Sequence, residues 1–104
     1  DAGPLAAAER ELREETGLSA RSWHDLGFID NSNGVTTDTA HMFLATGLAA
    51  GTSAPDPEEQ LTLSWVPFGQ AVEQVLAGSI TESVSVAAIL KVAALRPTLR
   101  PGPA

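Results

Sequence analysis

Residues 10–18 read Arg10-Glu11-Leu12-Arg13-Glu14-Glu15-Thr16-Gly17-Leu18 and are the most informative stretch of the 104-residue sequence. They close a longer run, PLAAAERELREET over residues 4–16, that consists almost entirely of strong helix formers. A proline is tolerated in the first turn of a helix and a glycine commonly follows its end, which fits Pro4 and Gly17. The sequence therefore predicts a helix over residues 4–16.

The spacing of apolar residues along this helix distinguishes an apolar face from a charged one. Leu5, Ala8 and Leu12 recur at steps of three and four residues, so they form one narrow apolar stripe. Most of the remaining surface carries charge. We expect the stripe to face a core and the charged residues to face water.

Glu11, Glu14 and Glu15 form an acidic group on this helix, because spacings of three and four residues bring their carboxylates to one side. Like charges at such spacings repel by roughly a few tenths of a kcal/mol per pair, and a divalent cation would neutralise them. Mg²⁺ and Mn²⁺ prefer oxygen ligands, and Mg²⁺ is often coordinated partly by phosphates of the substrate. The alternative is a solvated face on which Arg10 and Arg13 pair with neighbouring glutamates.

The order of residues in this stretch resembles the second half of the Nudix box, REL-x-EE-x-GL. That box is the motif of hydrolases that cleave nucleoside diphosphates linked to another group X. The matching positions are Arg10, Glu11, Leu12, Glu14, Glu15, Gly17 and Leu18. The resemblance implies that Glu11 and Glu15 are the principal metal ligands and that Glu14 is a further ligand or organises water. It also implies that Arg10 orients a glutamate, while Gly17 and Leu18 are structural.

The resemblance also implies a fold. We expect an α/β (α+β) protein with a Nudix-type mixed β-sheet sandwiched between helices, in a single domain over residues 1–104. The glutamate of the first half of the box would fall on Ala2, and the chain has no room for the strands that precede the box in that family. We therefore expect the C-terminal part of a Nudix domain, without its N-terminal strands.

The other elements are predicted from periodicity and turn residues. Strands are expected around residues 23–29 and 39–46, and a third over residues 61–68 in which Pro67 interrupts the ladder. Helices are expected over residues 70–77 and 81–95. Turn formers occupy residues 31–34, and residues 49–57 have the composition of a surface loop.

Residues 57–68, PEEQLTLSWVPF, resemble the acidic loop, strand and proline turn of ADP-ribose pyrophosphatase relatives. In those relatives a glutamate on this loop activates water or binds metal. The resemblance thus implies Glu59 as the catalytic base, with Glu58 as the alternative. Both glutamates could instead only keep a loop soluble.

Composition excludes several classes of function. Thirteen acidic against six basic residues give a formal charge of −7, which disfavours binding to nucleic acid. The absence of cysteine excludes disulfides, thiolate metal sites and cysteine nucleophiles. No apolar run is long enough to span a membrane, and no signal peptide is recognisable at the start. We therefore expect a cytoplasmic protein without a membrane partner.

The histidines and tryptophans give weaker indications. His24 and His41 are too few and too far apart in sequence to suggest a zinc site, so ordinary half-buried or surface roles are expected. Trp23 and Trp65 could stack on a base, although core or interface positions are commoner for tryptophan.

The function implied by the resemblance is metal-dependent hydrolysis of a pyrophosphate bond in a small-molecule nucleotide, with Mg²⁺ or Mn²⁺ as the cofactor. ADP-ribose, which would give AMP and ribose 5-phosphate, is the favoured substrate. Two alternatives stay open: a housecleaning nucleoside triphosphate pyrophosphatase, and a non-catalytic Nudix-like nucleotide-binding module. The ADP-ribose pyrophosphatase subgroup further implies a homodimer.

Overall fold

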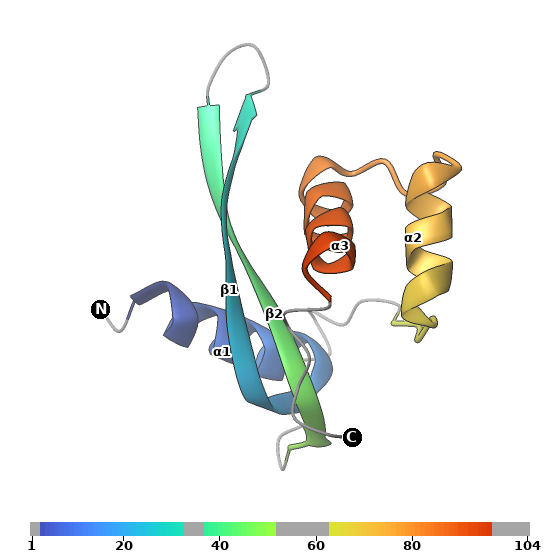
Figure 1. Cartoon of the computed structure of the whole chain (residues 1–104). Coiled ribbons are helices and arrows are strands. Elements are labelled where there is room, and N and C mark those ends of the chain that lie inside the picture. The colour runs from blue at the N-terminus through green and yellow to red at the C-terminus, as the bar shows by residue number, and fades with distance from the viewer. Residues whose placement is uncertain (1–2, 33–36, 52–62, 97–104) are drawn as a thin grey trace. The chain divides into compact units, whose positions relative to one another are not determined.

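A computed structural model describes residues 3–32, 37–51 and 63–96. In chain order these contain α1 (Gly3–Thr16), β1 (Leu18–Ser32), β2 (Thr37–Ala50), α2 (Phe68–Leu76) and α3 (Ser83–Leu95) (Figure 1). This combination of helices with a sheet confirms the expected fold class. The chain divides into two compact units, Asp1–Trp23 with Ala45–Trp65 and His24–Leu44 with Val66–Ala104, which are described separately.

Strands β1 and β2 pair as antiparallel neighbours in a two-stranded sheet (Figure 1). Both are longer than predicted, because the polar residues at the start of β1 and the small residues at the end of β2 resemble loop sequence. At one end of the hairpin the backbone N–H of Gly51 donates to the carbonyl of Gly17 at 2.7 Å. The hairpin therefore begins directly where α1 ends.

The first unit contains α1, which has the predicted boundaries to within one residue. None of the residues of α1 is buried. Leu5 is 42% exposed, while Ala8 and Leu12 are half-buried. The expectation that this stripe faces a core is therefore wrong for the described part of the chain, since no described element covers it closely enough to bury it.

The second unit contains the hydrophobic core. Leu26 of β1, Met42 of β2 and Val92 of α3 are buried together. The half-buried apolar residues packed around them are Ile29, Leu44, Phe68, Val84, Ala87, Ala88 and Leu95. Leu26 and Ile29 both reach this core although they are three residues apart in a strand. Gly27 lies between them with a φ of 86°, and this local irregularity shifts the alternation as a β-bulge does.

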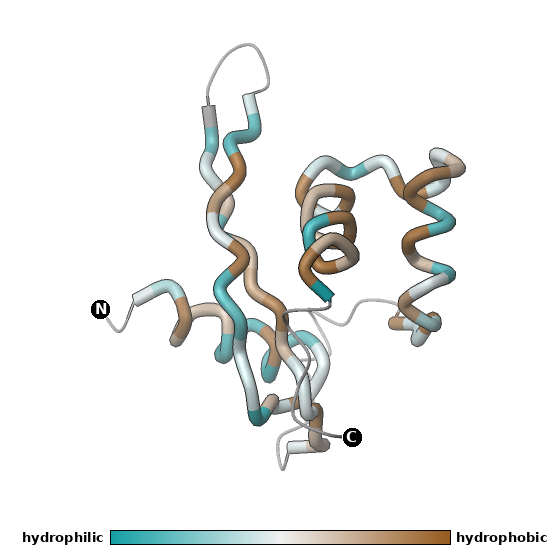
Figure 2. The backbone as a smooth tube through the Cα atoms, in the orientation of Figure 1, coloured by the Kyte–Doolittle hydropathy of each residue, from teal (hydrophilic) through white to brown (hydrophobic). Residues whose placement is uncertain are grey.

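Helix α3 is apolar along most of its length (Figure 2). This composition fits a helix that packs against the hairpin and against α2. Its N-terminus is capped by Glu82, whose carboxylate accepts hydrogen bonds from the backbone N–H groups of Val84 and Ser85, both at 2.9 Å. No helix in the described ranges is long and apolar enough to cross a membrane.

The strand predicted over residues 61–68 is wrong for its described part. Residues 63–67 have no regular secondary structure, and α2 begins at Phe68; residues 61 and 62 lie outside the described residues. Pro67 cannot donate to a strand ladder, and its carbonyl instead accepts from the N–H groups of Gln70 and Ala71. Trp65 is 77% exposed, so it is not a core residue.

Candidate functional site

The candidate site is the acidic group on α1. Glu11 and Glu14 are exposed, and Glu15 is half-buried. The helix forms over all three residues, so the spacing of the sequence brings them to one side of α1. The structure thus presents three carboxylates on a regular helix, accessible to a ligand from solvent.

Arg10 pairs with one of these carboxylates. Its Nε lies 3.9 Å from Oε1 of Glu14, in the relation i to i+4 along the helix. Both side chains are about half exposed, at 57% and 49%, so the pair adds little to stability. The pair places the Arg10 guanidinium next to the Glu14 carboxylate.

The end of α1 is fixed by hydrogen bonds that sequence analysis did not single out. The Thr16 hydroxyl donates to the Leu12 carbonyl at 2.6 Å and accepts from the Leu18 N–H at 3.1 Å. Gly17 has a φ of 75° and donates its N–H to the Arg13 carbonyl at 2.8 Å. The position of Thr16 directly before Gly17 is the sequence feature from which these hydrogen bonds could have been predicted. These bonds hold the last turn, which carries Glu14 and Glu15.

Glu14 and Glu15 lie at an unfavourable end of the helix. The C-terminal end of a helix carries a partial negative charge, so each carboxylate there costs roughly 0.3–1 kcal/mol of stability. Arg13 is the basic residue in this last turn. The helix dipole therefore does not favour glutamates in the last turn of α1. A bound cation would make them favourable there.

The residues of α1 fit a magnesium ion by the chemistry of their donors. All three offer carboxylate oxygen, and Mg²⁺ is commonly held by one or two carboxylates plus waters and substrate phosphates. Within residues 3–32, 37–51 and 63–96, no group of three or more acidic or histidine side chains is arranged so that it could hold a metal ion. The donors of α1 therefore fit Mg²⁺ by their chemistry, while the described side chains are not gathered into a metal-binding cluster.

The remaining predicted catalytic residue cannot be placed. Glu59, and its alternative Glu58, lie outside the described residues. The assignment of Glu59 as the base thus stays a prediction.

A second polar group, in the other unit, was not predicted. Nε2 of His41 lies 2.8 Å from Oδ1 of Asp25, and the His41 ring lies between Phe28 and Phe43 with centroid distances of 4.1 and 4.3 Å. The hydrogen bond from His41, together with one from the Gly27 N–H, lowers the pKa of Asp25. No motif joins residues 25 and 41 in sequence, because the pair depends on hairpin pairing.

Comparison with known proteins agrees with the motif on α1. Residues 1–86 match the NUDIX domain family. The ADP-ribose pyrophosphatase of Mycobacterium tuberculosis is 37% identical over 94 residues, which cover 88% of this chain and 45% of that protein. The chain thus spans about half the length of this curated relative.

Proposed function

The chain belongs to the Nudix family, and from this membership we propose that it hydrolyses a pyrophosphate bond in a nucleoside diphosphate linked to another group. The observation that carries the proposal is the glutamate group of α1, on an exposed helix that ends at Gly17. ADP-ribose is the proposed substrate, since a relative 37% identical to the chain is named ADP-ribose pyrophosphatase. The products would be AMP and ribose 5-phosphate.

The proposed roles are those that the match of residues 10–18 to the Nudix box implies. Glu11 and Glu15 would hold Mg²⁺, or Mn²⁺ in its place, and Glu14 would be a further ligand or orient water. When bound, the metal supplies positive charge that neutralises phosphate oxygens and acidifies water. Arg10 would orient Glu14, its ion-pair partner at 3.9 Å. Glu59 would accept the proton of the attacking water as the phosphoanhydride bond breaks.

We also propose how the chain assembles and where it is located. A homodimer and a cytoplasmic location follow from the family resemblance and from the sequence composition. Light scattering of the purified chain tests the first, and a dimer at micromolar concentration is the expected result. A monomer at every concentration would contradict it.

The test of function is hydrolysis of ADP-ribose with and without Mg²⁺, beside a panel of nucleotide sugars and nucleoside triphosphates. It is run on this chain and on any longer protein that contains it. Magnesium-dependent release of AMP from ADP-ribose is the expected result. Hydrolysis of triphosphates alone would replace the proposed substrate class, and turnover of none of the compounds by either protein would overturn the proposal.

A further inference from the structure

The first unit contains a pocket on another side of α1. Its volume is about 340 Å³, and it lies between α1 and the start of β1. The lining residues are Ala6, Glu9, Arg13, Leu18, Ser19, Ala20 and Trp23. None of the glutamates proposed to bind metal is among them.

The position of this pocket separates it from the metal-binding face. Ala6, Glu9 and Arg13 are spaced by three and four residues, so they share one face of α1. At about 100° per residue, that face is roughly opposite the one that carries Glu11 and Glu15. A ligand in the pocket would therefore not contact the proposed metal site.

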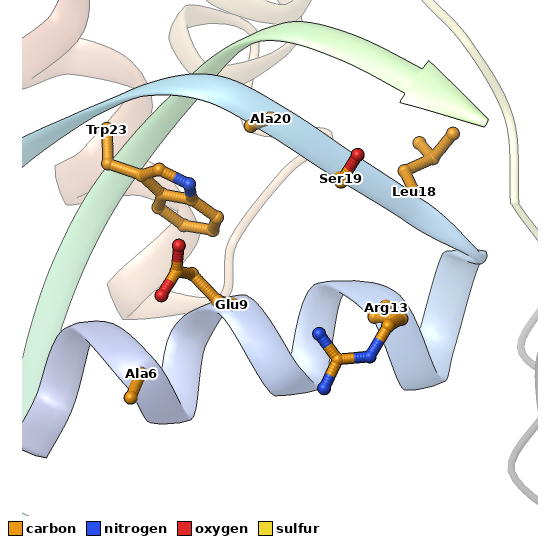
Figure 3. Close-up of a pocket in the computed structure, with 7 residues that line it drawn as sticks. All are labelled: Ala6, Glu9, Arg13, Leu18, Ser19, Ala20 and Trp23. Atoms are coloured by element: carbon orange, nitrogen blue, oxygen red, sulfur yellow. The ribbon is translucent and has the colours of Figure 1, made fainter. Parts of the chain in front are cut away.

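The lining combines one aromatic ring with one charge of each sign. Figure 3 shows the Trp23 indole and the Glu9 carboxylate pointing toward one another, with the Arg13 guanidinium extending along the helix toward them. Glu9 can only accept hydrogen bonds and Arg13 can only donate them. A ligand that uses both must carry a donor and an acceptor, and a flat ring would stack on the half-buried Trp23.

Charge narrows the class of ligand further. The single carboxylate and the single guanidinium in the lining cancel, and the chain carries −7 overall. An additional phosphate would meet no excess of positive charge there. The volume also falls within the range of small-molecule sites, about 300–1,000 Å³.

We propose that this pocket binds an uncharged flat heterocycle such as the base of adenosine, with the ring against Trp23, an amino group donating to Glu9 and a ring nitrogen accepting from Arg13. The site is separate from the hydrolytic one and needs no metal. The inference does not depend on the proposed function, because binding here is expected whether or not the chain hydrolyses anything.

Adenosine binding to the 104-residue chain in EDTA tests the proposal. In the Trp65→Phe variant the fluorescence comes from Trp23 alone, and Trp65 is exposed enough to be replaced without loss of folding. We expect saturable quenching by adenosine, and weaker quenching by AMP at the same concentration. No saturable change up to millimolar adenosine, or equal affinity for AMP, would overturn the proposal.

Matched arginine variants locate the binding. Arg13→Ala should weaken adenosine binding roughly tenfold or more, because it removes a hydrogen bond from a charged donor. Arg21→Ala removes an exposed arginine from β1 outside the pocket and should change affinity by no more than about twofold. Because both residues are exposed, both variants should fold. Equal effects of the two substitutions, or binding that requires Mg²⁺, would contradict the assigned site.

Discussion

Helices α1 and α3 differ in how much they bury and in where their acidic residues lie. Val92 of α3 is buried in the core, and the carboxylate of Glu82 caps its N-terminus. Helix α1 buries no residue and carries two glutamates in its last turn, where a helix tolerates them least. Contacts within the described chain hold α3 in place, whereas the ion pair of Arg10 with Glu14 in α1 is exposed and adds little to stability.

This difference indicates which helix is constrained by folding and which by binding. A carboxylate at a helix N-terminus accepts free backbone N–H groups and is stabilised by the helix dipole. The same group in the last turn faces free carbonyls, where Arg10 and Arg13 offset part of the repulsion and a bound cation would offset more. Substitutions in α3 and its core should therefore change stability, while substitutions of the glutamates of α1 should change activity.

The largest expected effect is the loss of activity in Glu15→Gln. Removing a proposed metal ligand should lower magnesium-dependent AMP release by at least about 100-fold, because metal stabilisation of the transition state is worth several kcal/mol. The free energy of unfolding should stay within about 0.5 kcal/mol of wild type or rise slightly, since one like charge leaves a repulsive group. Hydrolysis assays and urea unfolding of the same preparation measure both quantities.

Glu73→Gln is the matched control for this prediction. Glu73 is an exposed glutamate of α2, outside the proposed site. Its replacement should leave hydrolysis and stability unchanged. A Glu15→Gln protein as active as the control would contradict the metal-site assignment.

The next largest effect compares leucines of the two units. Leu26 is 2% exposed, so Leu26→Ala should lower the free energy of unfolding by about 2–5 kcal/mol. Leu5 on α1 is 42% exposed, and Leu5→Ala should cost less than about 1 kcal/mol. Urea unfolding midpoints of both variants measure the difference. Equal losses would mean that the apolar stripe of α1 is packed as tightly as the core.

A smaller effect is expected at the junction of α1 and β1. Gly17 has a φ of 75°, a conformation that costs a residue with a side chain roughly 1–2 kcal/mol. Gly17→Ala should lower stability by about that amount. Gly69→Ala is the control, because Gly69 lies in α2 with no atom near enough to meet a new Cβ, and there alanine should stabilise. Thermal unfolding of the two variants should therefore shift in opposite directions.

Local sequence predicted the helices well and the long-range features poorly. Strong helix formers, Pro4 and Gly17 placed α1 to within one residue of its observed start. Alternation suggested a strand from Leu61 until Pro67 interrupts it, but residues 63–67 have no regular secondary structure. The contact between Asp25 and His41 could not be anticipated, because it depends on which residues of β1 and β2 face one another.

The glutamate motif could be predicted from the sequence because its residues lie within two turns of one helix. The pocket between α1 and β1 was not, since only its helix residues share a recognisable spacing. Sequence therefore predicts a site best when one element supplies most of it. Glu59 is the contrasting case: its role depends on the placement of a separate segment, which lies outside the described residues.

The smallest expected effect is the pH dependence that Glu82 gives to α3. Hydrogen bonds from the Val84 N–H and from Ser85 hold the pKa of Glu82 below its ordinary value of 4.5. A lowered pKa in the folded state means that the stabilisation is fully present above pH 4.5 and is lost as the pH falls through the folded-state pKa. Glu82→Gln should therefore be less stable than wild type at neutral pH, and the gap should narrow in acid. Urea unfolding of both proteins across the acidic range measures it, and a gap that widens in acid would contradict the capping role.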